Sequence, residues 1–235
     1  MIRILVTGAG SLLGQGIIKS LESSSLEFNI TGTDYFPSAV GLYWTNKGYI
    51  LPDILKPEIS EAEWVEYLIK VIIKEDISIV MPGVDFEIPI LAKHKSFIEK
   101  QTKAILVVSS EEVVRIGDDK WETVKYLKRK GFKYPNSSLP ENTESFIQSN
   151  HFPFIVKPRF GHTSKNVFLV KNETELDNAI KKCDKPVIQE YLEGPQQEYT
   201  CGATCINQEI ITIISLRRTL KNGNTQLAFC ERTDM

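Results

Sequence analysis

The sequence predicts an α/β protein in which a domain built on a parallel β-sheet is followed by an α+β domain. Two observations support this prediction. In the first half of the chain, short apolar strands alternate with amphipathic helices, the pattern of βαβ units wound into a parallel sheet. After Ser109 the predicted strands follow one another with little helix between them, which favours a mostly antiparallel arrangement.

The first half opens with a buried strand. The segment from Ile2 to Thr7 is apolar and β-branched, and apolar residues recur at helical spacing from Leu12 to Leu21. A second predicted strand ends at Asp34. Further elements of the same kind are a helix around residues 64–72, a strand at 77–81, a helix from residue 88 and a strand at 104–108.

The second half begins with a charged amphipathic helix, which we expect over Asp118 to Lys130 with Gly131 as its C-cap. Beyond it, the one clear helical pattern spans Glu173 to Lys182. Five strands are predicted at 154–157, 167–171, 187–190, 198–206 and 210–217. We therefore divide the chain into domains at 1–112 and 113–235, and the second domain into a lid subdomain at about 134–188 and the start of another at 189–235.

Composition narrows the classes of function. Lys and Arg number 28 against 30 Asp and Glu, so a formal net charge of −2 provides no global attraction for nucleic acid or membranes. No apolar run reaches the ~18 residues of a membrane helix, and the N-terminus lacks the pattern of a signal peptide. We expect a cytoplasmic protein without nucleic-acid or membrane partners.

The four cysteines show no metal-site spacing. They form no Cys-x-x-Cys pair, and the three histidines lie far from them in sequence. Cys201 and Cys205 fall on one face of a predicted strand, so we expect both to be small reduced core residues, which favours a reducing compartment. The other two cysteines are Cys183 and Cys230.

The turn after the first strand is similar to a dinucleotide-binding fingerprint. Gly8, Gly10 and Gly14 precede or enter a helix, and Asp34 closes the next strand. In such fingerprints the glycines admit a pyrophosphate and the acid binds ribose. The spacing is that of short-chain dehydrogenases.

Those enzymes also need a Tyr-x-x-x-Lys pair, and the chain offers two. Tyr43 with Lys47 lies too early in the sequence, and Tyr126 with Lys130 lies on the charged helix. We therefore interpret the glycine turn as structural. An NAD(P)-dependent reductase or epimerase is the alternative.

Three further segments carry the chemistry of a nucleotide site. The first is Asp119-Lys120 at the start of the charged helix, followed by Gly131 and Pro135. Taken alone, Lys120 is better interpreted as an exposed helix lysine.

The second segment is an apolar strand that ends in Lys157-Pro158-Arg159 and leads into a polar loop at 160–166. Backbone N–H groups, a hydroxyl and fixed cations in such a loop are suited to phosphate oxygens. A plain hairpin loop is the alternative.

The third segment is Val187-Ile188-Gln189-Glu190-Tyr191-Leu192, with Glu198 after a glycine-containing turn. A carboxylate accepts two hydrogen bonds and so suits ribose hydroxyls. A surface hairpin with solvated acids is the alternative.

In this order and at this spacing, the three segments resemble the ATP-grasp superfamily, in its carbamoyl-phosphate-synthase-like branch, which carries a Rossmann-like domain ahead of the grasp domain. The resemblance covers nearly the whole chain. It implies that Lys157 lies near the α-phosphate and adenine, that Glu190 and the next backbone groups bind the base, and that Glu198 binds ribose. The nucleotide-binding residues it implies are Lys120, Lys157, Arg159, Gly161, Ser164, Lys165, Glu190, Tyr191, Leu192 and Glu198.

The chain departs from the family pattern in two places. His162, Thr163 and Asn166 stand in the loop where glycine is common. The expected magnesium ligands, a Glu and then Glu-x-Asn, are not found after Glu198, so we assign no metal ligand and no catalytic residue. Because the grasp domain would continue past Met235, we expect a cloned fragment, a split-gene subunit or a natural short form.

The resemblance implies the ATP-binding module of a carboxylate–amine ligase that works through an acyl phosphate. ATP is the implied cofactor, with Mg²⁺ in the complete enzyme, and the substrates are a small carboxylate and an amine. A homodimer or a complementing C-terminal half is the implied partner. A non-catalytic nucleotide-binding subunit is a further alternative, and whether this chain is itself an enzyme stays open.

Overall fold

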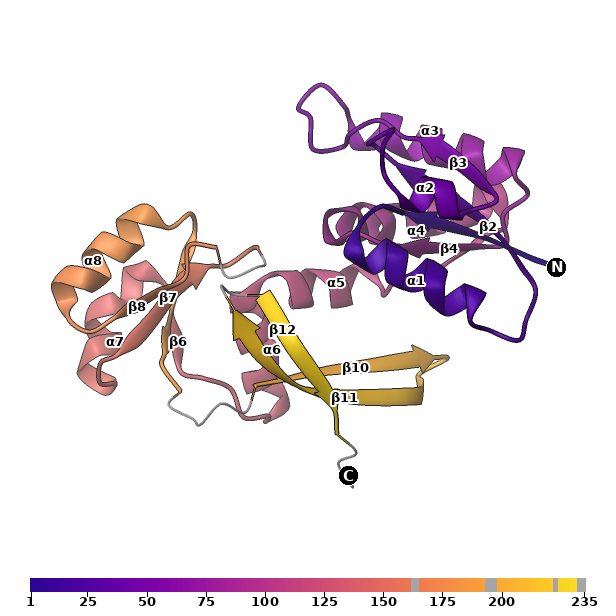
Figure 1. Ribbon diagram of the computed structural model, residues 1–235. Helices are drawn as coiled ribbons and strands as arrows, with labels where there is room; N and C mark the ends of the chain where they lie inside the picture. The colour runs from indigo at the N-terminus through magenta and orange to yellow at the C-terminus, as the bar shows by residue number, and fades with distance from the viewer. Residues whose placement is uncertain (162–164, 193–197, 222–223, 232–235) are drawn as a thin grey trace. The chain divides into compact units, whose positions relative to one another are not determined.

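The computed structural model describes residues 1–161, 165–192, 198–221 and 224–231 (Figure 1). The chain forms two compact units, Met1–Arg115 and Ile116–Met235, and the division falls inside helix α5 (Glu111–Asp118). The first unit holds a parallel sheet and the second holds antiparallel sheets, so the predicted fold class is confirmed. None of the helices within these ranges is long and apolar enough to cross a membrane.

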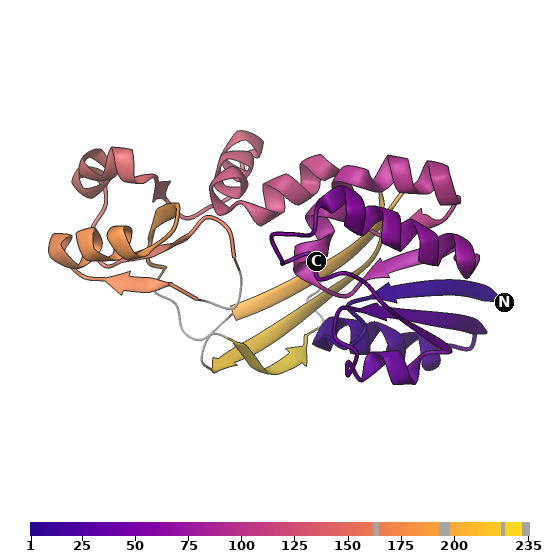
Figure 2. The same cartoon turned by 90° about the horizontal axis from the view of Figure 1, so that it is seen from above.

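The first unit is a doubly wound sheet whose five parallel strands run in the order β3-β2-β1-β4-β5. Alternation along β1 explains its two cores: Leu5 packs with Leu68 and Leu91 on one face, and Val6 packs with Ile18 on the other. Figure 2 shows helices on both sides of this sheet. Its elements are β1 (Ile2–Thr7), α1 (Leu12–Glu22), β2 (Phe28–Asp34), α2 (Gly41–Trp44), β3 (Lys47–Ile50), α3 (Glu61–Lys74), β4 (Ile79–Pro82), a 3₁₀ turn (Asp85–Glu87), α4 (Ile88–Thr102) and β5 (Ile105–Leu106).

The second unit contains a four-stranded antiparallel sheet in the order β6-β9-β7-β8. Helices α7 and α8 cover one face, where Phe146 and Leu176 pack with Phe154 and Val156 of β7 (Figure 1). The elements that build this part are α6 (Lys120–Lys130), β6 (Ser137–Ser138), α7 (Thr143–Ser149), β7 (Phe154–Pro158), β8 (Phe168–Val170), α8 (Glu173–Lys182) and β9 (Pro186–Glu190).

The remaining sheet of this unit is β10 (Glu198–Ile206), β11 (Glu209–Lys221) and β12 (Asn224–Cys230), all antiparallel. Strand β10 is exposed along its whole length. The prediction that Cys201 and Cys205 are core residues is therefore wrong, because strand alternation shows which residues share a face but not whether that face is covered. Cys183, by contrast, is buried, and all four cysteines are free.

The helix expected over Asp118 to Lys130 is α6, which begins two residues later than predicted, at Lys120. Asp119 is its N-cap, and the Asp119 side chain accepts from the Trp121 amide. Helix α5, which ends at Asp118, was not predicted. Gly131 closes α6 with φ 74°, as predicted. Helix α7 was not predicted. It is only seven residues long and buries only Phe146, which is too little for a visible helical period.

Candidate phosphate-binding site and the family of the chain

Lys157 lies on the face of the four-stranded sheet opposite α7 and α8. Phe154 and Val156 face those helices, so the alternation of β7 places Ile155 and Lys157 on the other face. The Lys157 ammonium donates to Gln189 Oε1 of the neighbouring strand at 2.7 Å. The Gln189 amide in turn donates to Ser137 Oγ of β6 at 2.8 Å. The lysine thus contacts β9 directly and is linked to β6 through Gln189.

Lys120 reaches the same region from the first turn of α6. Its backbone N–H donates to the carbonyl of Arg159 at 3.0 Å. Its ammonium donates to the carbonyl of Gly161 at 2.8 Å and to that of Arg159 at 3.3 Å. The helix N-terminus and this lysine therefore hold the start of the loop that follows β7. Positive charge at a helix N-terminus is a common setting for anion binding.

Arg159 is paired within the protein. Its Nε donates to Asp119 Oδ1 at 3.0 Å, and one of its terminal nitrogens donates to Oδ2 of the same carboxylate. Burial would raise the pKa of Asp119, but the bonds from Arg159 and from the Trp121 amide lower it overall. Arg159 thus ties the loop to the cap of α6, and its implied contact with phosphate stays a prediction.

The two lysines form a partly buried pair of cations. Burial lowers the pKa of Lys157, and the positive charge of Lys120 lowers it further. Burial also lowers the pKa of Lys120, against the carboxylates of Asp118 and Asp119, which raise it. Two ammonium groups that repel each other in a partly desolvated place are stabilised when an anion enters between them. This arrangement suits a polyphosphate.

The residues implied for the base lie at the end of β9. Glu190 accepts from the Asn136 amide N–H at 2.7 Å and from its side chain at 3.3 Å. The backbone N–H of Tyr191 donates to the carbonyl of Pro153 at 3.3 Å, whereas Leu192 is exposed. Because β9 pairs with β7 up to Glu190, the predicted subdomain division at 188–189 would run through a strand of this sheet.

Glu198 forms an ion pair in the other sheet of this unit, where Arg218 lies 2.6 Å from its carboxylate. Arg217 pairs with Glu231, which also accepts from Tyr199 at 2.9 Å. The arginines at this strand end are thus both paired within the protein.

Two implied loop residues remain. Lys165 lies in an exposed turn. Ser164 lies outside the described residues, as do residues 162–163 and 193–197.

Gln189, Ser137 and Asp119 carry this geometry but were not among the predicted site residues. Gln189 could have been noticed, because the alternation of the strand places a polar side chain on the same face as Lys157 across the sheet. No pattern in the sequence links Ser137 or Asp119 to their partners.

The residues that the structure describes contain no group of three or more His, Cys, Asp or Glu side chains that could hold a metal ion.

The glycine turn of the first unit makes contacts within the protein. Asp34 accepts from the Gly10 amide at 2.9 Å and from the Phe36 amide at 3.0 Å. A Cβ on Gly14 would lie 2.3 Å from the Gly8 carbonyl oxygen. Close packing of α1 on the turn thus accounts for Gly14 without a ligand. The Tyr126–Lys130 pair considered for a reductase belongs to the second unit.

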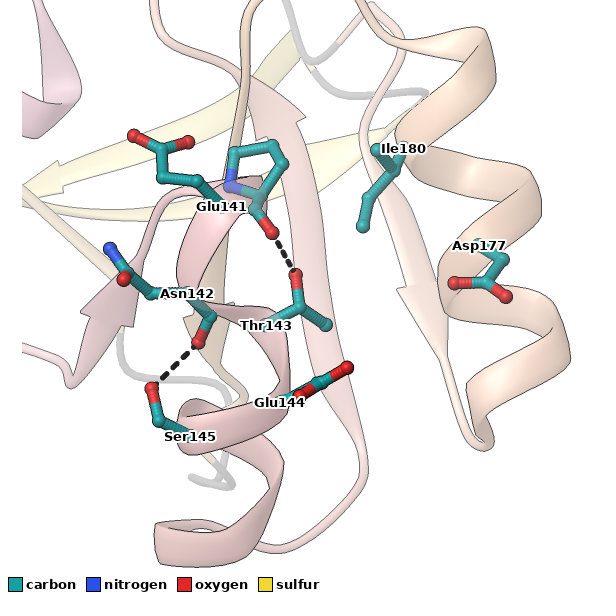
Figure 3. A pocket seen from close by; sticks show the side chains of 8 residues that line it. Glu141, Asn142, Thr143, Glu144, Ser145, Asp177 and Ile180 are labelled. Atoms are coloured by element: carbon teal, nitrogen blue, oxygen red, sulfur yellow. Dashed lines mark hydrogen bonds between the residues drawn. The ribbon is translucent and has the colours of Figure 1, made fainter.

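A pocket of about 600 Å³ lies between residues 140–145 and α8 (Figure 3). Glu141, Glu144 and Asp177 line it, and Thr143 donates to the carbonyl of Pro140 beside them. Three carboxylates repel polyphosphate, so this pocket is not the nucleotide site.

Comparison with known proteins assigns both parts of the chain. Residues 117–230 match the model of the ATP-grasp domain, and residues 4–106 match the model of the PylC-like N-terminal domain. The D-alanine–D-alanine ligase of Fusobacterium nucleatum is 33% identical over 98 residues, which is 42% of this chain and 31% of that protein. The carbamoyl phosphate synthase large chain of Sulfolobus acidocaldarius is 23% identical over 219 residues, 86% of this chain and 20% of that protein.

Among solved structures, N5-carboxyaminoimidazole synthetase from Staphylococcus aureus, complexed with ADP, superimposes with a TM-score of 0.66 at 15% identity. The match covers 95% of this chain and 56% of that chain. The chain thus spans about half the length of this structure and less of the curated relatives. With a PylC-like N-terminal domain followed by an ATP-grasp domain, the chain belongs to the ATP-grasp superfamily.

Proposed function

We propose that this chain supplies the ATP-binding module of an ATP-dependent carboxylate–amine ligase. The observation that carries the proposal is a pair of partly buried cations. Lys120, at a helix N-terminus, holds the start of the loop at Arg159 and Gly161, and its charge acts on Lys157, at the end of the strand that leads into this loop. The ligases among the relatives support the same class of reaction.

In the proposed reaction, a carboxylate oxygen attacks the γ-phosphorus of ATP, the bond to the bridging oxygen breaks, and ADP leaves. An amine then attacks the carbon of the acyl phosphate and releases phosphate, with one proton passing to solvent. In the first step Lys120 and Lys157 bind phosphate oxygens and offset the negative charge that would repel the incoming carboxylate. We assign no step to a metal.

The test is the binding of ATP to the Lys157→Ala variant, measured by isothermal titration calorimetry. Loss of a partly buried cation that pairs with phosphate costs about 2–5 kcal/mol, so we expect the affinity to fall by about thirtyfold or more. Lys181→Ala is the matched control, because Lys181 is an exposed lysine of the same unit. Equal affinities in the wild type and both variants would show that the site is elsewhere.

NAD and NADP are measured alongside ATP. Saturable binding of either at micromolar concentration, abolished by Asp34→Ala, would instead favour the reductase or epimerase alternative.

A further inference from the structure

The Lys157 ammonium is the first member of a directed chain of hydrogen bonds across three strands. It donates to Gln189 Oε1 at 2.7 Å, Gln189 Nε2 donates to Ser137 Oγ at 2.8 Å, and Ser137 Oγ donates to the carbonyl of Pro135 at 2.8 Å. An ammonium has donors only, so the amide oxygen of Gln189 must face Lys157 and its NH₂ must face Ser137. The chemistry of the partners thus fixes the orientation of the amide.

Strand register makes this chain possible. Gln189 of β9 lies opposite Ser137 of β6 and opposite Ile155 of β7. Lys157 is two residues beyond Ile155 and so lies on the same face of the sheet. All three side chains are therefore carried by paired strands rather than by the loop, and this gives Lys157 a fixed base.

Gln189 is neutral, and this matters for an anion site. A carboxylate at this position would hold Lys157 equally well but would cancel its charge. An amide oxygen takes one of the three N–H bonds of the ammonium and leaves two donors and the full positive charge for a ligand. Among the described groups, the charge of Lys120 on α6 lowers the pKa of Lys157. Asp118, Asp119 and Cys183 in turn raise the pKa of Lys120.

We infer that Gln189, oriented by Ser137, is a positioning residue that holds the Lys157 ammonium in place for a nucleotide phosphate. The inference rests on the proposed function. Removal of the amide acceptor should lower the affinity for ATP even though Gln189 itself need not touch the nucleotide. It should also make the ammonium easier to deprotonate, because the acceptor stabilises the charged form.

The experiment compares Gln189→Met and Gln189→Glu with the wild type. Calorimetric titration with ATP is repeated between about pH 7 and pH 10, and the apparent pKa of Lys157 in the protein without nucleotide is read from the pH dependence of its acetylation by mass spectrometry. We expect Gln189→Met to bind ATP about tenfold more weakly, with the loss of affinity at high pH moved to lower pH.

We expect Gln189→Glu also to bind ATP more weakly near pH 7, since it neutralises Lys157, but to raise the pKa of the lysine. We expect the titration midpoint of Lys157 to be highest with Glu at position 189, lower with the native Gln and lowest with Met. A merely structural role of residue 189 would not produce this order. Ser137→Ala should give a weaker version of the Gln189→Met result. Gln148→Met, at an exposed glutamine of α7, is the control and should leave every readout unchanged.

Two failures are distinguishable. If Lys157→Ala binds ATP as the wild type does, or if the wild type binds no ATP, the nucleotide site is wrong and the inference falls with it. If Lys157→Ala loses ATP while the Gln189 variants keep both the affinity and the Lys157 midpoint, the site stands and the positioning role is overturned. Thermal unfolding of each variant confirms that the fold is retained in the samples compared.

Discussion

Glu87 is a carboxyl group buried in the first unit, and its hydrogen-bond partner is the hydroxyl of Thr7. Burial is the main reason that the pKa of Glu87 is raised to about 7. The charge of Asp34 also raises this pKa, whereas the hydrogen bond from Thr7 lowers it. This carboxyl therefore takes up a proton when the chain folds at mildly acidic pH.

We predict that the first unit loses stability as pH rises through this range. Between pH 4.5 and about 7 the folded state retains a proton that the unfolded chain has released, so the free energy of unfolding falls with rising pH. In Glu87→Gln this contribution is absent. The difference in unfolding free energy between wild type and variant should therefore change across the window by an amount on the order of 3 kcal/mol.

Urea denaturation at a series of pH values checks this prediction. Glu22→Gln, at an exposed residue of the same unit, is the control and should follow the wild type. If the unfolding free energies of the wild type and Glu87→Gln change in parallel with pH, the prediction is contradicted.

The residues of the phosphate site differ in how far the sequence could reveal them. Lys120 and Lys157 could be found because each stands at the end of an element with a readable pattern. The pairing of Asp119 with Arg159, 40 positions apart, and that of Ser137 with Gln189, 52 positions apart, could not be found in the sequence. Pairings of this kind depend on strand register and helix docking, which local patterns do not specify.

At the scale of the element, a helix or strand could be predicted where its apolar residues show strong periodicity. Strand β1 and helices α1, α3 and α8 follow clear patterns and were predicted. Strand β3 (Lys47–Ile50) was missed because it is a short edge strand with little burial, and a polar face gives no alternation to detect. The N-cap at Asp119 was hidden because Asp118 and Asp119 are adjacent and either could begin the helix.

Helix α1 provides two glycines for a matched comparison. Gly14 packs against the backbone of the glycine turn, whereas Gly16 is exposed and has nothing within 4 Å of the position of a Cβ. We predict that Gly14→Ala destabilises the first unit by about 1–3 kcal/mol or more, because backbone must move to admit the methyl group. Gly16→Ala should stabilise it by about 0.5–1 kcal/mol, since alanine favours the helix.

Chemical denaturation of both variants measures the two effects. If both variants lose stability, alanine destabilises α1 for a reason other than the contact of Gly14 with the turn. Equal stability in both would show that α1 does not pack closely on the turn.

At the scale of the whole molecule, the two units have separate apolar cores. The buried clusters of the first unit draw on β1, β2, α1, α3 and α4, and the cluster of the second draws on β7, β9, α7 and α8. In the part of the chain that the structure describes, each of these clusters is drawn from the segment of its own unit.

We predict that each unit can be loosened without the other. Gly14→Ala should speed amide hydrogen exchange in β1 and β2 and leave β7 and β9 unchanged, and Val156→Ala, which removes methyl groups from a fully buried side chain, should do the reverse. Mass spectrometry of peptides from the exchanged protein separates the two regions. Faster exchange in both units from either single variant would contradict the prediction.

The double role of Asp119 bears on how this protein can change over generations. One carboxylate both caps α6 and holds Arg159, which begins the loop after β7. An Asn at this position would still serve as a helix cap but would leave the arginine without its anionic partner. Drift at position 119 is therefore coupled to position 159. Among relatives of this chain we expect positions 119 and 159 to covary. An acidic residue should be retained at 119 where a cationic residue stands at 159, and a neutral helix cap should occur at 119 where residue 159 is not cationic.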